Sequence, residues 1–242
     1  MTPFVKEVQS AARKLYAILS KGWHYSYSVH SDIGAGGDRT AGIDSLAETI
    51  YIDALNKFGQ IDSEESGIIG CNSATKIIID PIDGSDNAIS GFPYYGSSIA
   101  LERDGKVKEA VVVNLANGDF FYKIDSALMR GKLNSDNFEP VIKRKDAMVG
   151  IFEKAYAYPV LSQALLSKNI KFRSPGAVAL SLAYAHNVNF VIFAGPRRRY
   201  DFAAALCMCE GLEIIEEDEL LIVAKSSQLA QNLHHLALAQ KG

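Results

Sequence analysis

Residues 77–87 read Ile77-Ile78-Ile79-Asp80-Pro81-Ile82-Asp83-Gly84-Ser85-Asp86-Asn87, and this stretch decides the fold. Three consecutive isoleucines behind Lys76 predict a buried strand. Pro81 has no N–H for a further ladder hydrogen bond, and Gly84-Ser85 predicts the start of a short helix that Ser85 or Asp86 caps. Asp80 and Asp83 are therefore expected at the mouth of a strand, beside free helix N–H groups.

This arrangement has two interpretations. Carboxylates beside helix N–H groups suit a divalent cation and a phosphate held side by side. Asp-Pro and Asp-Gly are also common turn dipeptides, so the stretch can simply end a strand. The other motifs of the chain decide between the two.

Composition and length predict a soluble globular protein of one large domain or two closely packed lobes. The chain has 242 residues, of which 48% are apolar and 22% charged, and its net charge of −3 gives no indication of a nucleic-acid partner. No apolar run reaches the roughly 18 residues that span a bilayer, and the first twenty residues carry charges at Lys6, Glu7, Arg13 and Lys14. The cysteines Cys71, Cys207 and Cys209 show no zinc spacing. We expect a cytoplasmic protein with no nucleic-acid or membrane partner.

Two amphipathic helices are predicted in the first sixty residues. Thr2-Pro3 starts the first, which runs to Gly22, and the second runs from Ile43 to Phe58, before Gly59. Asp44 lies at the start of the second helix, where a carboxylate can simply satisfy the helix dipole. Residues 23–29 are expected to form a strand or an aromatic lid. The glycine-rich residues 31–40 are either a mobile segment over a phosphate site or a plain surface loop.

The middle of the chain predicts an antiparallel meander. Strands are expected at residues 96–101, 107–114 and 119–123, with turns at Asp104-Gly105 and Asn117-Gly118. Residues 124–146 are polar and predict an irregular boundary between two lobes, 1–145 and 146–242. The second lobe alternates short strands and helices up to residue 239.

Two further charged runs have more than one interpretation. Asp62, Glu64 and Glu65 form either a solvated turn or part of a site for a hard cation, which takes oxygen ligands from separate segments. Arg197-Arg198-Arg199 can be solvated surface, a nucleic-acid patch or a site for a substrate anion. Its position just before Asp201 favours the substrate site.

Four motifs in order resemble the inositol monophosphatase superfamily, which includes fructose-1,6-bisphosphatases and 3′-phosphoadenosine phosphatases. They are Asp44, Ser63-Glu64-Glu65, Asp80-Pro-Ile-Asp-Gly-Ser85 and Tyr200-Asp201-Phe-Ala-Ala. Residues 173–180 look like the strand-to-helix turn of the family's second lobe. Gly34-Ala-Gly-Gly-Asp38 with residues 43–48 is most similar to the archaeal-type dual inositol monophosphatase/fructose bisphosphatase. The resemblance implies an α/β fold, a layered αβαβα sandwich of the sugar phosphatase type, in a single phosphatase unit.

The resemblance also implies the site. The metal ligands would be Glu64, Asp80, the carbonyl of Ile82, Asp83 and Asp201, holding two or three Mg²⁺ ions, with Mn²⁺ as a possible replacement. Asp44 and Ser85 would orient and deprotonate the attacking water, with Glu64 as a further catalytic residue, and Gly84 and Ser85 would bind phosphate. The implied substrate contacts are Asp86, Arg173, Ser174, Gly176, Ala177, Arg197 and Arg198. Converging carboxylates would repel one another without bound cations.

The expected function is therefore that of a lithium-sensitive, Mg²⁺-dependent phosphomonoesterase on inositol phosphate and/or fructose-1,6-bisphosphate. Its partner is a small phosphorylated sugar or cyclitol, and a homodimer is expected. One alternative is a 3′(2′),5′-bisphosphate nucleotidase acting on phosphoadenosine phosphate, and another is a non-catalytic phosphate-binding relative. Ala194 stands where inositol-specific enzymes carry glutamate, which puts a strict inositol preference in doubt.

Overall fold

The computed structural model describes residues 1–239, except for the side chains of Ser31 and Asp32. Its helices are α1 (Pro3–Leu19), α2 (Gly42–Leu55), α3 (Ser85–Ile89), α4 (Pro159–Ser167), α5 (Val178–Ala183), α6 (Arg199–Cys207) and α7 (Ser227–Leu238). Its strands are β1 (His30–Ile33), β2 (Arg39–Ala41), β3 (Gln60–Ser63), β4 (Gly67–Ile69), β5 (Thr75–Asp83), β6 (Gly96–Arg103), β7 (Lys106–Asn114), β8 (Asp119–Ile124), β9 (Ala127–Lys132), β10 (Phe138–Pro140), β11 (Gly150–Glu153), β12 (Phe172–Arg173), β13 (Phe190–Ala194), β14 (Glu213–Glu217) and β15 (Leu220–Ala224).

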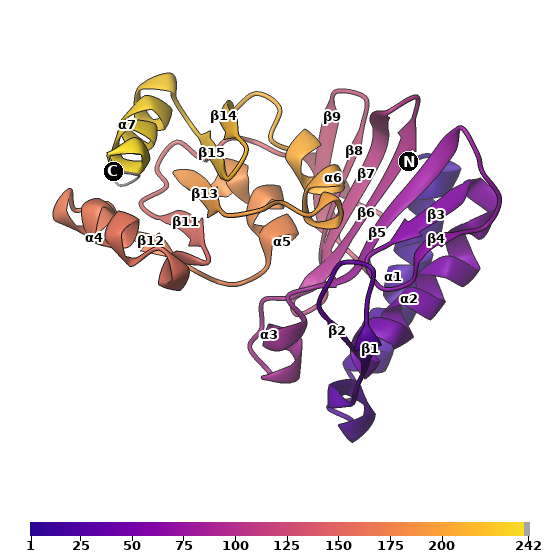
Figure 1. The fold of residues 1–242 in the computed structure, drawn as a ribbon. Coiled ribbons are helices and arrows are strands. Elements are labelled where there is room, and N and C mark those ends of the chain that lie inside the picture. Colours follow the sequence, from indigo (N-terminus) through magenta and orange to yellow (C-terminus); the bar gives the residue numbers. More distant parts are fainter. Residues whose placement is uncertain (240–242) are drawn as a thin grey trace.

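Two sheets carry the fold (Figure 1). Among the described residues, the larger sheet has eight strands in the order β10-β9-β8-β7-β6-β5-β3-β4, and its neighbours are antiparallel except for the pair β3 and β5. The smaller has five strands in the order β12-β11-β13-β15-β14, with β11 parallel to both of its neighbours. A short hairpin, β1 and β2, leads into α2.

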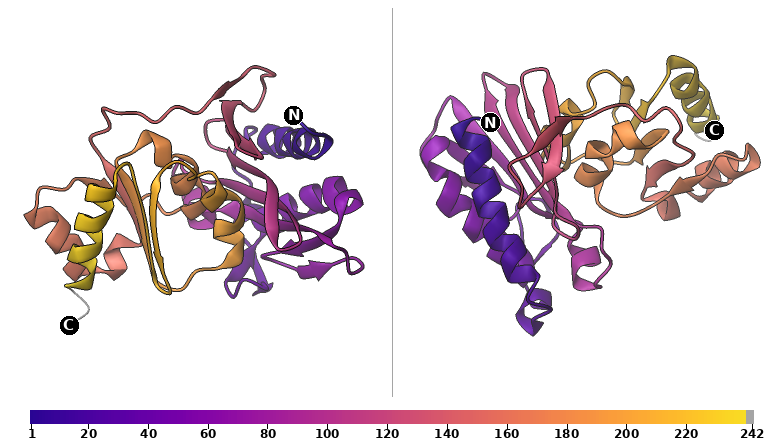
Figure 2. Two further views of the ribbon diagram at one scale, coloured as in Figure 1. Left: turned by 90° about the horizontal axis from the view of Figure 1, so that it is seen from above. Right: turned by 180° about the vertical axis from the view of Figure 1, so that it is seen from behind.

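Helices and sheets alternate in five layers (Figures 1 and 2). Ile77 and Ile79 of β5 pack with α1 and α2 on one face of the larger sheet, and Ile78 points to the other face, where α5 and α6 lie. The same two helices contact the smaller sheet through Val191 and Phe193, and the far face of that sheet packs against α4 and α7. Strand alternation thus gives each sheet two apolar faces. The predicted α/β layered sandwich is confirmed.

The central strand is longer than the sequence predicts. β5 continues past Pro81 to Asp83, because the pairing register with β6 shifts between Asp80 and Asp83. Pro81 lies in this bulge, where its missing N–H costs the ladder nothing. The bulge also changes the alternation of side chains, so that Ile82 faces the α1–α2 core while Asp83 accepts a hydrogen bond from Leu180 of α5.

Three local expectations are wrong. Residues 124–146 contain β9 and β10, which extend the larger sheet, instead of being irregular. For residues 23–29 the strand interpretation is wrong, since they contain a 3₁₀ turn at Tyr25–Ser28, and the aromatic lid stays a prediction. The N-cap of α3 is Gly84, in the left-handed conformation at φ 87°, and no described side chain caps this helix.

None of the helices within residues 1–239 combines the length and apolar character needed to cross a bilayer.

Candidate active site

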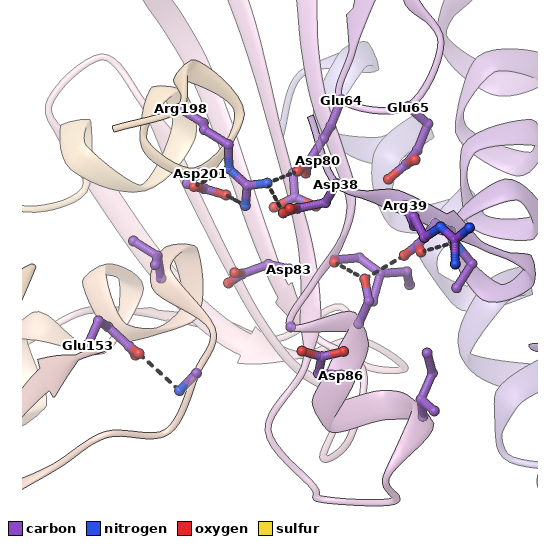
Figure 3. Close-up of a pocket in the computed structure, with 18 of the residues that line it drawn as sticks. Asp38, Arg39, Glu64, Glu65, Asp80, Asp83, Asp86, Glu153, Arg198 and Asp201 are labelled. Atoms are coloured by element: carbon purple, nitrogen blue, oxygen red, sulfur yellow. Dashed lines mark hydrogen bonds and ion pairs between the residues drawn. The ribbon is translucent and has the colours of Figure 1, made fainter. Parts of the chain in front are cut away.

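An acidic cluster lies where three segments meet (Figure 3). Glu64 follows β3, Asp80 belongs to β5 and Asp201 is in the first turn of α6. One carboxylate oxygen from each of the three lies within 4.8 Å of the others. The cluster therefore brings together Glu64 and Asp201, which are far apart in the sequence.

Local structure fixes each of these carboxylates. The amide of Glu64 donates to the carbonyl of Ile79 at 3.0 Å, so the acidic turn continues the β3–β5 pairing. The glycine-rich loop packs on this turn, since Gly36 N lies 2.6 Å from the carbonyl of Glu64. A Cβ on Gly36 would lie 2.5 Å from Glu64 Cγ, which explains why glycine stands there. Glu64 is only 8% exposed, so the interpretation as a solvated turn does not apply to it.

Burial makes the charged forms of these acids costly. It raises the pKa of Glu64 to about 7 and raises the pKa values of Asp80 and Asp83 well above their usual range, with repulsion from neighbouring carboxylates adding to the effect. Asp80 Oδ1 is buried and has no hydrogen-bond partner among the described residues. A buried acceptor without a donor, beside two further carboxylates, fits a hard divalent cation.

A second pair of residues lies next to the cluster. Ser85 Oγ donates to Asp44 Oδ1 at 2.6 Å and also lies 3.0 Å from the carbonyl of Ile82. Asp44 Oδ2 accepts from the amide of Ala41 at 2.9 Å, and Asp44 is 2% exposed. Burial raises the pKa of Asp44, although the hydrogen bonds from Ser85 and Ala41 act to lower it. Asp44 is thus more than a first-turn charge, because its carboxylate holds a hydroxyl at the site.

The guanidinium group of Arg198 forms ion pairs with two acids of the cluster and with Asp38. Its Nη1 lies 2.6 Å from Glu64 Oε1 and 2.6 Å from Asp38 Oδ2. Its Nε and Nη2 lie 3.2 Å from the two oxygens of Asp201. The guanidinium therefore bridges α6, the turn after β3 and the β1–β2 hairpin.

These groups line a pocket of about 460 Å³. Most of the site residues predicted from the sequence lie in its wall, namely Asp44, Glu64, Asp80, Ile82, Asp83, Gly84, Ser85, Asp86, Gly176, Arg198 and Asp201. The structure thus brings together every predicted metal ligand and phosphate contact, and their roles stay predictions.

Four predicted substrate contacts are not in the pocket wall, namely Arg173, Ser174, Ala177 and Arg197. Arg197 Nη1 instead lies 2.7 Å from Glu216. Ser174 Oγ accepts from the amide of Ala155, and Ala177 is 1% exposed in the core. Their assignment to the substrate also stays a prediction.

Several pocket residues were missed by sequence reasoning. The most informative is Glu153, which is fully buried at the end of β11 and accepts hydrogen bonds from Gly176 N at 2.9 Å and from Ser181 Oγ. Lys154 and Tyr156 follow it in the wall. The charged pair Glu153-Lys154 at the end of this apolar strand could have indicated the position, because site residues gather at the carboxyl ends of parallel strands.

The profile of the Inositol monophosphatase family matches residues 1–212. The chain therefore belongs to the inositol monophosphatase family, a family of Mg²⁺-dependent phosphomonoesterases. Among its relatives, the fructose-1,6-bisphosphatase of Pyrococcus furiosus is 30% identical over 156 residues, which are 63% of this chain and 58% of that enzyme. The Nus factor SuhB of Salmonella typhimurium is 28% identical over 217 residues, which cover 84% of this chain and 80% of SuhB.

A solved structure supports the same fold. The MJ0109 gene product, an inositol monophosphatase–fructose 1,6-bisphosphatase, superposes with a TM-score of 0.80 at 20% identity, over 97% of this chain and 100% of that chain. At this identity the likeness concerns the fold alone.

Proposed function

We propose that this protein is a Mg²⁺-dependent phosphomonoesterase that hydrolyses inositol phosphate and/or fructose-1,6-bisphosphate. The observation that carries the proposal is the convergence of Glu64, Asp80 and Asp201 within 4.8 Å, beside the Ser85–Asp44 hydrogen bond. Acids alone indicate a cation site. The adjacent carboxylate-held hydroxyl adds a group that can orient water.

The metal ligands we propose are Glu64, Asp80, the Ile82 carbonyl, Asp83 and Asp201. Two or three Mg²⁺ ions fit the charge of this set, and Mn²⁺ is a possible replacement because both are hard ions that prefer oxygen ligands. When bound, such ions lower the pKa of a coordinated water and stabilise the charge of a departing oxygen. The remaining chemistry is assigned to the protein's own side chains and amides.

Ser85 and Asp44 are proposed to position the nucleophile. Ser85 has one hydroxyl proton, which Asp44 and the Ile82 carbonyl compete for, so the lone pairs of Oγ remain available to accept from a water. The proton of that water can pass to Oγ while the hydroxyl proton moves to Asp44, whose raised pKa suits a base. No described side chain accepts a hydrogen bond from the first amides of α3, so the amides at Gly84–Ser85 can donate to phosphate oxygens.

The substrate is proposed to be a small phosphorylated sugar or cyclitol. The side chain of Ala194 cannot hydrogen-bond a ring hydroxyl, and Ala194 does not line the pocket, so we expect loose selectivity for inositol. The cationic wall residues Arg39 and Lys154 can pair with a second anionic group. We therefore expect fructose-1,6-bisphosphate to be hydrolysed at least as efficiently as inositol-1-phosphate, in line with the relative from Pyrococcus furiosus.

Other functions compete with this proposal. A 3′(2′),5′-bisphosphate nucleotidase acting on phosphoadenosine phosphate would use the same metal chemistry. A non-catalytic phosphate-binding relative is the other alternative, and the relative from Salmonella typhimurium is named as a Nus factor, a name that states no phosphatase activity. Against it, a set of buried acids is costly to retain where no cation is needed.

A substrate panel tests the proposal. Inorganic phosphate release is measured with Mg²⁺ for inositol-1-phosphate, fructose-1,6-bisphosphate and phosphoadenosine phosphate, with Asp201→Asn as the control for contaminating phosphatase. The highest kcat/KM is expected for one of the first two. A clear preference for phosphoadenosine phosphate would favour the nucleotidase, and wild-type activity no greater than that of Asp201→Asn on all three would contradict the proposal.

A further inference from the structure

The arginine run before Asp201 is divided in an unexpected way. Arg197 pairs with Glu216 at 2.7 Å, and Arg199 pairs with Asp62 at 2.8 Å and Glu102 at 2.7 Å. Both therefore neutralise acids that do not line the pocket. Only the middle residue, Arg198, enters the acidic cluster.

Arg198 contacts its acids as a bridging cation would. Its Nη1 lies 2.6 Å from both Glu64 and Asp38, between a buried carboxylate and one whose side chain is 84% exposed. The opposite edge of the guanidinium faces Asp201 through two contacts of 3.2 Å. Figure 3 shows the three acids arranged around the guanidinium group. Such forked contacts hold an arginine in place more firmly than a single ion pair does.

This charge is permanent. A guanidinium does not deprotonate in proteins, so Arg198 supplies one positive charge to the cluster under all working conditions. Its burial is partial, with 33% of the side chain exposed, and its three partners come from three separate elements. A divalent ion placed between Glu64 and Asp38 would have to displace Nη1 or lie against it, and like charges at that separation repel.

We propose that Arg198 is a built-in cation of the acidic cluster, which takes the position between Glu64 and Asp38 that a further divalent ion would otherwise fill. The inference rests on the proposed function and makes it more specific, because it sets the number of divalent ions at two. Asp80, Asp83, the Ile82 carbonyl and the remaining lone pairs of Glu64 and Asp201 are then left for those two ions.

Counting bound Mn²⁺ tests this inference without any assay of activity. Equilibrium dialysis at saturating Mn²⁺, with free ion measured by electron paramagnetic resonance, gives the number of ions per chain. The wild type is expected to bind two ions and Arg198→Gln three. Arg197→Gln is the matched control, since it removes the neighbouring charge outside the cluster, and it should bind two. A count in Arg198→Gln equal to or below that of the wild type would overturn the inference.

Asp38→Asn gives a second, independent test, which holds even where Arg198→Gln fails to fold. If Arg198 fills the position beside Asp38, removing that carboxylate leaves the count at two, whereas a lower count would make Asp38 a metal ligand and overturn the inference. Combined with Arg198→Gln, Asp38→Asn should return the count from three to two. A wild type that binds no Mn²⁺ would contradict the proposed function as well, whereas Mg²⁺-dependent hydrolysis with unchanged counts in Arg198→Gln contradicts this inference alone.

Discussion

The hydroxyl of Ser85 lies 2.6 Å from Asp44 Oδ1, although 41 positions separate the two residues in the chain. Ser85 begins α3 directly after the central strand, and Asp44 lies in the first turn of α2. The same carboxylate accepts from the amide of Ala41, so its second oxygen is fixed by the start of its own helix. Two separate helices, α2 and α3, therefore hold one acid–hydroxyl pair beside the acidic cluster.

Ser85→Ala tests the role assigned to this hydroxyl. Without Oγ, Asp44 no longer reaches a water through Ser85, and we expect kcat to fall by roughly 10²–10⁴-fold, the range for a lost acid–base group. Ser85→Thr keeps the hydroxyl and should retain activity. Steady-state kinetics on inositol-1-phosphate checks both variants. An alanine variant as active as the threonine variant would remove Ser85 from the mechanism.

Asp83→Asn and Asp44→Asn should differ in whether they lose Mg²⁺ affinity together with activity. Asp83→Asn removes one charge of the metal set, so turnover and Mg²⁺ affinity should both be lost. Its fold should persist, and the metal-free protein should gain about 1–2 kcal/mol, because Asn has no carboxyl whose ionisation is opposed by burial. Asp44→Asn should lower kcat and leave Mg²⁺ affinity unchanged. Calorimetric titration with Mg²⁺ separates the two, and an equal loss of affinity in both variants would contradict this division of roles.

The stability of the metal-free protein should fall as pH rises. Burial raises the pKa of Glu64 to about 7 and raises the pKa values of Asp80 and Asp83, whereas in the unfolded chain these acids titrate at about pH 4. Between the unfolded and folded pKa values the native state binds more protons, so the free energy of unfolding decreases with pH in this window. Below about pH 4 these acids are protonated in both states, so the penalty for ionising buried acids is absent from the free energy of unfolding.

Bound Mg²⁺ should offset this penalty, so its stabilising effect should be larger at about pH 8 than at about pH 5. Urea unfolding at the two pH values, with Mg²⁺ or with a chelator, measures the difference. Stability of the chelated protein that rises from about pH 5 to about pH 8 would show that these acids are not compensated by cations in the way proposed.

Gly84→Ala should damage the site more than the fold. Gly84 has φ +87°, and an added Cβ would lie 3.1 Å from the Gly176 carbonyl and 3.2 Å from the Tyr94 carbonyl. Gly91→Ala is the matched control, because Gly91 has φ +69° and open space around its Cβ. Thermal unfolding should show a cost of about 1–2 kcal/mol for the left-handed backbone in Gly91→Ala, and at least that cost in Gly84→Ala, where the close contacts add to it. Only Gly84→Ala should also lower kcat, and equal kinetics would show that the turn after β5 tolerates a side chain.

The buried central strand follows from the sequence for physical reasons, whereas the five-layer fold and the set of metal motifs were predicted through the resemblance to the family. The isoleucine run makes a strand with two apolar faces, and amphipathic helices must cover both. Acids placed at the end of that strand, Asp80 and Asp83, then lie in the wall of the pocket. Asp201 was predictable only through its motif, because the distance along the chain gives no indication that α6 packs beside β5.

The parts that were missed depend on pairing between distant segments. Nothing in Pro81 alone shows that a bulge will let β5 continue, since this depends on the register of β6. The three adjacent arginines are alike in sequence, and only the directions set by the start of α6 send Arg198 to the cluster and Arg197 to Glu216. Glu153 was missed because its two hydrogen-bond donors, Gly176 and Ser181, come from the turn and helix after β12.

The most direct test of the central claim is a metal back-titration of phosphate release. Protein stripped with a chelator is assayed on fructose-1,6-bisphosphate and inositol-1-phosphate while free Mg²⁺ is raised from zero, with Asp83→Asn in parallel. We predict no release without Mg²⁺, a saturable rise in the wild type, inhibition by lithium in the millimolar range and no rise in Asp83→Asn. Full activity of the stripped wild type in excess chelator would contradict the account.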